Sequence, residues 1–233
     1  MAEVVKKQWI RQAVAGKTFA DIGGLGGEAM NEMVTVAIES GAAEANMVDV
    51  LPENHALWQC FHKICASKQI TNYKSLVADL NEMDPGPHGR FDFVHCSGIL
   101  YHVPDPISML WQLRKLTRES LILTSATVPS VVRNESGKAV LTPGKAVFVP
   151  ALAGPELAVY SRHFENLGMA IEVLDGSSPE WISNGFTTIN YGPWWWLFTE
   201  EYIHRMLEIC GLRVLEKQET WKDRGWSFLC RRV

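Results

Sequence analysis

Paired cysteines are missing from this sequence. Its five cysteines stand at positions 60, 65, 96, 210 and 230, and none of them forms a Cys-x-x-Cys pair. An odd, scattered set is typical of the reduced thiols of intracellular proteins, not of a disulfide framework. No histidine or carboxylate cluster repeats the spacing of a metal site either, so we expect no bound metal.

Long apolar runs are missing too. None approaches the roughly 20 residues that a membrane-spanning helix needs. After Met1 the chain reads Ala-Glu-Val-Val-Lys-Lys, without the apolar core that follows the lysines of a secretory signal. We therefore expect a cytoplasmic protein without a membrane partner.

An excess of positive charge is the third absence. Lysine and arginine number 22 against 26 aspartates and glutamates, which gives a net charge of −4. Proteins that bind nucleic acids usually carry a basic surface, so we do not expect a nucleic-acid partner. With 233 residues, of which 47% are hydrophobic, the chain is long enough for one well-packed domain over residues 1–233.

Glycine is concentrated in one place. A short apolar run over 17–22 predicts a strand, four of the next five residues are glycine, and a helical pattern follows over 28–40. Glycines in such a turn allow positive φ angles and let a ligand approach the backbone. The free amides at the start of the helix favour an electron-rich group. The stretch therefore predicts a cofactor-binding turn.

Three cofactor classes use a turn of this kind. A phosphate-binding P-loop is excluded, because Gly-Glu-Ala stands where Gly-Lys-Ser/Thr is required. Gly24-x-Gly26-x-x-Ala29 fits the nicotinamide pattern, with Asp49 placed 25 positions after Gly24. Asp21, two positions before the first glycine, favours S-adenosylmethionine, since a carboxylate suits its cationic groups better than it suits a diphosphate. The turn alone leaves these last two alternatives open.

Strands and helices alternate along the first half of the chain. We expect strands over 46–50, 75–80, 91–98 and 120–125, and helices over 2–15, 53–66 and 107–116, with Lys6 and Lys7 of the first helix facing solvent. This alternation predicts a parallel sheet with helices on both faces.

The end of the chain predicts a different strand pairing. A helix over 199–210, with Thr199 as its N-cap, precedes strands over 212–220 and 226–232. The short turn at 222–225 makes these two strands a hairpin, so one of them must run antiparallel to the rest of the sheet.

Residues 127–197 break the alternation. They are rich in proline, glycine, serine and aromatic residues, with a helical pattern only near 154–167. We interpret them as a lid or substrate-binding insertion over the carboxyl edge of the sheet. Their aromatic residues would also suit a homodimer interface.

The motifs resemble those of the class I S-adenosylmethionine-dependent methyltransferases. The match covers 17–125 and 198–232, and its strongest part is Phe91-Asp-Phe-Val-His-Cys-Ser-Gly-Ile-Leu-Tyr-His-Val-Pro-Asp-Pro106, which is similar to a segment of one methyltransferase subgroup. That subgroup includes small-molecule enzymes and wobble-uridine carboxymethyl-transferring enzymes. The resemblance implies a Rossmann-like α/β fold with a seven-stranded, mostly parallel sheet and an antiparallel C-terminal hairpin.

The resemblance also implies the cofactor contacts. Asp49 resembles the acidic residue that holds the ribose hydroxyls, and Asp79, followed by Leu80, resembles the residue beside the adenine, although Asp79 could equally cap a helix. Ser97 would lie under the amino-acid end of the cofactor. Leu25 replaces the middle glycine of the family. The residues of the first motif are Asp21, Gly23, Gly24, Gly26 and Gly27.

Methyl transfer from a sulfonium requires alignment of the acceptor and exclusion of water. A hydroxyl acceptor must also lose a proton, and histidine is the usual base. His102, next to Tyr101 after the fourth strand, and His163 in the insertion are the candidate catalytic residues. His102 could instead cap the following helix, and His163 could be an exposed helix residue.

Tyr191 precedes three consecutive tryptophans at 194–196. Neighbouring side chains on a strand or helix point in different directions, so Trp194, Trp195 and Trp196 cannot all enter one core. We interpret Tyr191 and the tryptophans as an aromatic wall around the methyl acceptor. The alternative is packing of the insertion onto the helix at 199–210.

The sequence thus favours a methyltransferase of specialised metabolism that uses S-adenosylmethionine and acts on a small molecule, with O-methylation ahead of N-methylation. Three alternatives remain: a transferase of the tRNA wobble-uridine type, an NAD(P)-dependent oxidoreductase, and a non-catalytic protein that binds S-adenosylmethionine. The net charge speaks against the first, and Asp21 with the terminal hairpin speaks against the second.

Overall fold

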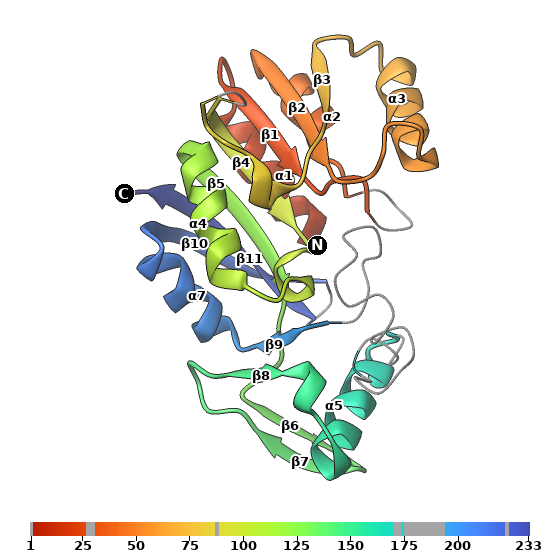
Figure 1. The fold of residues 1–233 in the computed structure, drawn as a ribbon, viewed down its shortest axis with the longest axis vertical. Helices are drawn as coiled ribbons and strands as arrows, with labels where there is room; N and C mark the ends of the chain where they lie inside the picture. The colour runs from red at the N-terminus through yellow and green to blue at the C-terminus, as the bar shows by residue number, and fades with distance from the viewer. Residues whose placement is uncertain (1, 27–30, 87–88, 170–173, 175–193, 222–223) are drawn as a thin grey trace.

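A seven-stranded sheet forms the centre of the protein (Figure 1). The computed structural model describes residues 2–26, 31–86, 89–169, 174, 194–221 and 224–233. In spatial order the strands are β3 (Tyr73–Val77), β2 (Glu44–Asp49), β1 (Thr18–Ile22), β4 (Phe91–Ser97), β5 (Thr117–Ala126), β11 (Gly225–Arg232) and β10 (Leu212–Thr220).

The first five strands of this sheet are parallel, whereas β11 runs antiparallel to both β5 and β10. The reversal arises because only a short turn joins β10 to β11, and such a turn can connect only antiparallel neighbours. The predicted fold, a Rossmann-like sheet closed by a C-terminal hairpin, is confirmed.

Helices cover both faces of the sheet. Phe19 and Phe93 point to the face covered by α1 (Ala2–Ala13), α2 (Val34–Glu39) and α3 (Ala56–Ser67). Their neighbours Ala20 and Val94 point to the other face, covered by α4 (Pro106–Leu116) and α7 (Glu200–Ile209). Side chains alternate across a strand, so a sheet covered on both sides needs apolar residues at consecutive positions, as these strands have.

Helix α1 corrects one expectation about the surface. Lys6 is only 1% exposed, and its Nζ donates a hydrogen bond to Oγ of Ser97 over 3.2 Å. The expected exposure of Lys6 is therefore wrong, because α1 packs across the sheet and brings this side chain to the end of β4. Thr199, in contrast, caps α7 as predicted, with its Oγ1 accepting from the amide of Tyr202 over 3.2 Å.

The helix expected over 28–40 spans Val34–Glu39, and two strand boundaries differ by three residues from those expected. Strand β3 ends at Val77, because Asp79 caps the short helix η1 (Leu80–Glu82) that follows. Strand β5 starts directly after α4, and its first residue, Thr117, pairs with Phe91 of β4.

The insertion has its own small core beyond the carboxyl ends of the parallel strands (Figure 1). It contains helix α5, whose limits agree with the expected 154–167, but it also forms short strands where the sequence showed none. Its elements are β6 (Val131–Asn134), β7 (Gly137–Val140), β8 (Ala146–Phe148), η3 (Val149–Ala151), α5 (Gly154–Asn166) and β9 (Trp196–Phe198). Strands β6 and β7 form an antiparallel hairpin, and β8 pairs with β9.

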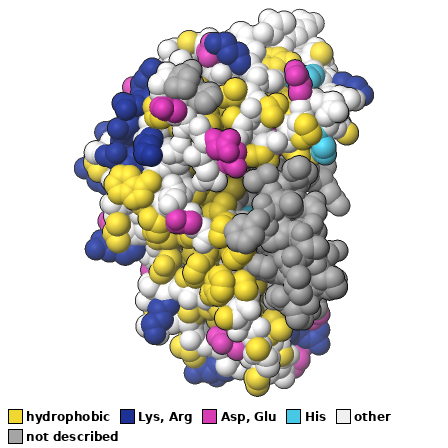
Figure 2. Space-filling model, in the orientation of Figure 1, with side chains coloured by type: hydrophobic (Ala, Val, Ile, Leu, Met, Phe, Trp, Pro, Cys, Tyr) yellow, Lys and Arg dark blue, Asp and Glu magenta, His cyan; other side chains and the backbone are white. Residues whose placement is uncertain are grey.

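Hydrophobic side chains gather at the surface over this insertion, in the lower half of the view in Figure 2. Three of its large apolar side chains are well exposed: Val131 at 45%, Val140 at 57% and Phe148 at 41%. Among the residues that the structure describes, no helix combines the length and the hydrophobicity needed to cross a bilayer.

Candidate functional site

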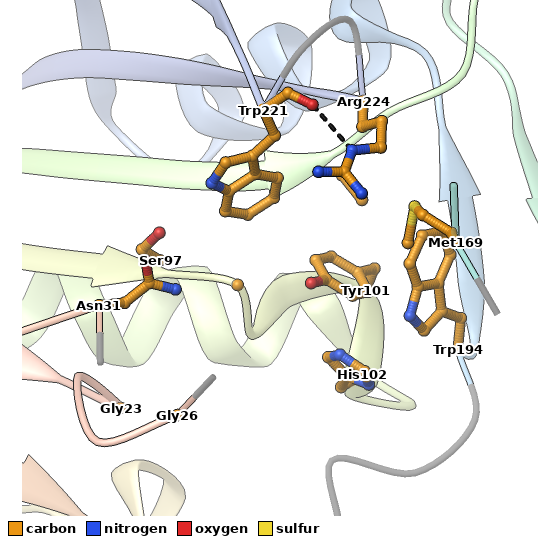
Figure 3. Close-up of a pocket in the computed structure, with 12 residues that line it drawn as sticks. Gly23, Gly26, Asn31, Ser97, Tyr101, His102, Met169, Trp194, Trp221 and Arg224 are labelled. Atoms are coloured by element: carbon orange, nitrogen blue, oxygen red, sulfur yellow. Dashed lines mark hydrogen bonds between the residues drawn. The ribbon is translucent and has the colours of Figure 1, made fainter. Parts of the chain in front are cut away.

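A cavity of about 330 Å³ opens at the carboxyl ends of β1, β4 and β5 (Figure 3). In open parallel sheets, ligands bind at these strand ends. Gly23, Gly26, Asn31 and Ser97 line one end of the cavity, and Tyr101, His102, Met169 and Trp194 line the other. Trp221 and Arg224, from the turn between β10 and β11, cover it from the side.

Two glycines of the turn, Gly23 and Gly24, leave no room for a larger residue. Gly23 has a φ of +72°, and a Cβ there would lie 2.1 Å from Cδ1 of Ile99. A Cβ on Gly24 would lie 2.4 Å from Oδ2 of Asp21, while Leu25 is fully buried in the core beneath the turn. Gly23 and Gly26 therefore present backbone to the cavity, whereas Gly24 and Leu25 hold the turn in place. Gly27 lies outside the described residues.

Asp21 lies under the turn and has no solvent exposure. Its Oδ1 accepts a hydrogen bond from Nδ1 of His95 over 2.7 Å, and its Oδ2 accepts one from the amide of Met33 over 2.6 Å. Burial lowers the pKa of His95, although the charge of Asp21 opposes this effect, so the imidazole is neutral at neutral pH. Asp21 thus anchors the turn and the start of α2, and it does not line the cavity.

Asp49, at the end of β2, has an unused acceptor. Its Oδ1 accepts from the amide of Leu51 over 3.1 Å, while its buried Oδ2 has no hydrogen-bond partner among the described residues. Burial raises the pKa of this carboxyl group. A buried oxygen without a partner is costly, and a donor from a ligand would relieve that cost. Asp49 is not among the residues that line the cavity, but its free oxygen fits a donor such as a ribose hydroxyl.

Asp79 caps η1, the alternative considered for it above. Its Oδ1 accepts from the amide of Asn81 over 2.8 Å and from the side-chain amide of the same residue over 3.1 Å. Leu80 is 8% exposed and packs in the core under α4. Neither residue lines the cavity. Ser97 does, and its hydroxyl accepts the hydrogen bond from Lys6.

Tyr101 and His102 come from the short helix η2 (Leu100–His102), directly after β4. In Figure 3 the hydroxyl of Tyr101 points toward the glycine end of the cavity. Burial raises the pKa of Tyr101 well above its ordinary value, so this hydroxyl is protonated and can donate a hydrogen bond. The ring of His102 lies 4.3 Å from that of Tyr101, measured between centroids.

The two candidate bases differ in position. His102 lines the cavity, whereas His163 does not. His163 packs against Phe164 on α5, with its Nε2 buried and without a hydrogen-bond partner among the described residues. Burial lowers the pKa of His163.

One of the three consecutive tryptophans lines the cavity. Trp194 is 3% exposed, and its ring meets that of Tyr101 edge-on at 4.6 Å and that of Phe164 at 5.1 Å. Trp195 and Trp196 instead pack against Phe148 of β8. Their directions differ, as consecutive residues require. Tyr191 lies outside the described residues.

Six lining residues were not among the sequence candidates: Asn31, Gly98, Ala126, Met169, Trp221 and Arg224. Arg224 lies in the segment 222–225, which was interpreted only as a hairpin turn, and Trp221 directly precedes it. The sequence signal that could have identified them is a large aromatic residue and an arginine at a turn that lies at the carboxyl end of the sheet. Within the described ranges, no three histidine, cysteine or acidic side chains converge as metal ligands would.

Comparison with known proteins adds the family. A family model described as "Methyltransferase domain" matches residues 2–217. No curated protein matches the sequence.

Solved structures of methyltransferases share the fold. Magnesium protoporphyrin IX methyltransferase from Synechocystis PCC 6803 with bound S-adenosylhomocysteine has a TM-score of 0.59 at 15% identity, over 99% of this chain and 81% of the other. The 1,6-didemethyltoxoflavin-N1-methyltransferase of Burkholderia thailandensis has a TM-score of 0.55 at 12% identity, over 97% of this chain and 78% of the other. Mitomycin 7-O-methyltransferase has a TM-score of 0.54 at 14% identity, over 98% of this chain and 54% of the other. At sequence identities this low, the structural similarity shows a common fold and nothing more.

Proposed function

The chain belongs to the methyltransferase domain family, and on this premise we propose that it transfers a methyl group from S-adenosylmethionine to a small-molecule acceptor. The observation that carries the proposal is the cavity itself, which joins the glycine-rich turn to an aromatic chamber. The similar structures described above are named for magnesium protoporphyrin IX, 1,6-didemethyltoxoflavin and mitomycin, and two of them hold S-adenosylhomocysteine.

The glycine end of the cavity would hold the cofactor, which supplies a methyl group already activated on a sulfonium. The backbone of Gly23 and Gly26 and the hydroxyl of Ser97 face this end. Oδ2 of Asp49 would accept a hydrogen bond from a ribose hydroxyl. Asn81 donates to Oδ1 of Asp79, so Oδ2 of Asp79 would accept a hydrogen bond from an adenine amino group. Asp21 would act indirectly, by holding the turn.

The other end would hold the acceptor. Tyr101 and Trp194 form aromatic walls that orient a planar molecule and exclude water. The imidazole of His102 lies in the same chamber and would take the proton from an acceptor hydroxyl, while the protonated hydroxyl of Tyr101 would donate a hydrogen bond. A base in this position favours O-methylation over N-methylation.

The insertion at 127–197 would serve as the lid of a single domain over 1–233. In support, Met169 and Trp194 of this segment form part of the cavity wall. Its exposed Val131, Val140 and Phe148 would suit a homodimer interface, which light scattering of the purified protein would test.

Calorimetric titration of the purified protein with S-adenosylmethionine, S-adenosylhomocysteine, NADH and NADPH tests the proposal. We expect the first two to bind, and Asp49→Ala to weaken both by about tenfold or more, since a charge-assisted hydrogen bond is lost. Glu53→Ala, which removes an exposed carboxylate, is the matched control and should bind normally. Binding of the nicotinamide cofactors alone would overturn the proposal.

A further inference from the structure

Arg224 is held at two points in the turn between β10 and β11. Its backbone carbonyl accepts from the amide of Thr127 over 3.1 Å. Its Nε donates to the carbonyl oxygen of Trp221 over 2.8 Å. Figure 3 shows the guanidinium group of Arg224 directed into the cavity, between Trp221 and Tyr101. The two terminal nitrogens of this group are therefore presented in a fixed direction.

The charge of Arg224 is not balanced by the described residues around it. Arg118, Arg162 and Arg205 form ion pairs with nearby carboxylates, but Arg224 forms none within the described part of the chain. Among the described residues no carboxylate lines the cavity, and the neighbouring Tyr101 hydroxyl is neutral because burial raises its pKa. A cation among aromatic walls is costly to desolvate, and an anionic ligand would offset this cost.

The backbone beside Arg224 is strained. Trp221 has a φ of +54°, which large side chains rarely adopt. This conformation places its carbonyl on Nε of Arg224 and its indole over the cavity. Gly225 makes room for the indole, since a Cβ at that position would lie 2.8 Å from Cε3 of Trp221. Strain of this kind is typical of functional positions.

Guanidinium groups bind carboxylates through two parallel hydrogen bonds. The rings of Tyr101, Trp194 and Trp221 around Arg224 favour a flat, aromatic molecule. The glycine end has a cation of its own, Lys6 at Ser97, so the positive charge of Arg224 serves the acceptor end. We propose that the methyl acceptor is an aromatic carboxylic acid, and that Arg224 binds its carboxylate. This substrate class rests on the function proposed above.

Matched pairs of aromatic acids and their neutral amides test this inference. The probes are 4-hydroxybenzoate with 4-hydroxybenzamide, salicylate with salicylamide, and quinoline-2-carboxylate with its amide. Binding to the complex with S-adenosylhomocysteine would be followed by the fluorescence of the cavity tryptophans. We expect at least one acid to bind about tenfold or more tightly than its amide, because the amide cannot form the charge-assisted pair.

Three variants assign this preference to a residue. Arg224→Gln should abolish the preference, and Arg224→Lys should keep part of it, because lysine retains the charge without the planar fork. Arg213→Gln, which removes an exposed arginine from β10, should leave the preference intact.

Three outcomes would overturn the inference. The first is the absence of any preference for acids, either because each acid and its amide bind equally or because neither binds up to its solubility limit. The second is a preference that survives Arg224→Gln. The third is a loss of S-adenosylhomocysteine affinity in Arg224→Gln with the acid preference unchanged, which would assign Arg224 to the cofactor. Failure of the wild-type protein to bind S-adenosylhomocysteine would instead refute the function proposed above.

Discussion

Nδ1 of His95 donates a hydrogen bond to Oδ1 of Asp21 over 2.7 Å, in a pair with no solvent exposure. The second oxygen of Asp21 holds the amide of Met33, at the start of α2. One carboxylate therefore joins β1, β4 and the helix after the glycine-rich turn. The shape of the proposed cofactor site depends on this buried charge, although Asp21 does not reach the cavity.

Asp21→Asn should destabilise the protein by about 3 kcal/mol, because the amide group of asparagine would face a donor where the carboxylate accepts two hydrogen bonds. Urea unfolding followed by circular dichroism would measure this change. Glu119→Gln, which breaks the surface pair with Lys17, is the control and should change stability by less than about 1 kcal/mol. Equal effects of the two substitutions would show that the buried pair has no special structural role.

His95 should make stability depend on pH. Its pKa is lowered by burial in the folded state from an ordinary value of 6.5, so below that value the unfolded chain binds a proton that the folded chain does not. Stability should therefore fall as the pH drops through 6.5, by up to about 1.4 kcal/mol per pH unit from this residue. The raised pKa of Asp49 acts in the opposite direction at lower pH.

Urea unfolding of the wild type and of His95→Gln between about pH 5 and pH 7 isolates this contribution. The variant should show a smaller slope of stability against pH than the wild type. An unchanged slope would mean that His95 is protonated in the folded state, with the charge of Asp21 outweighing the effects of burial and of the nearby Lys6.

The sequence was sufficient for the sheet because its signals are local. Phe19 and Ala20 are consecutive apolar residues of a strand covered on both faces, and the turn after Thr220 is too short for anything but a hairpin. Thr199 as an N-cap is a signal of the same local kind.

The site was harder to predict because tertiary packing places its residues. Lys6 lies 91 positions before Ser97 in the sequence, and its side chain reaches Ser97 only because α1 crosses the sheet. Arg224 enters the cavity because Trp221 adopts an unusual backbone angle, which no local pattern shows. His102 and His163 were both candidate bases from the sequence, and the structure separates them by their positions relative to the cavity.

His102→Gln should lower kcat for a hydroxyl acceptor by about 10²- to 10⁴-fold, with little change in cofactor affinity. His163→Gln is the matched control and should change kcat only slightly, because His163 does not line the cavity. A methyl-transfer assay at saturating cofactor, with calorimetric titration of S-adenosylhomocysteine, would measure both quantities. The reverse order of effects would exclude His102 as the base.

Trp194→Leu should raise the KM of the acceptor by about three- to tenfold, since the aromatic contact at the acceptor end is lost. Trp196→Leu should leave KM unchanged, because Trp196 packs on Phe148 and donates its Nε1 hydrogen to the carbonyl of Pro104. Steady-state kinetics of the two variants would measure the difference. Equal values of KM would mean that the aromatic wall does not contact the acceptor.

Gly23→Ala and Gly16→Ala separate backbone strain from steric overlap. The two glycines have nearly the same φ, +72° and +73°, but a Cβ on Gly16 would meet nothing within 4 Å. Gly16→Ala should therefore cost about 1 kcal/mol of stability, for the left-handed backbone alone. Gly23→Ala should cost more and weaken S-adenosylhomocysteine binding, because its methyl group overlaps Ile99 and displaces the turn. Adding Ile99→Ala to Gly23→Ala should restore part of the binding, whereas a failure to restore it would mean that the Cβ itself blocks the cofactor.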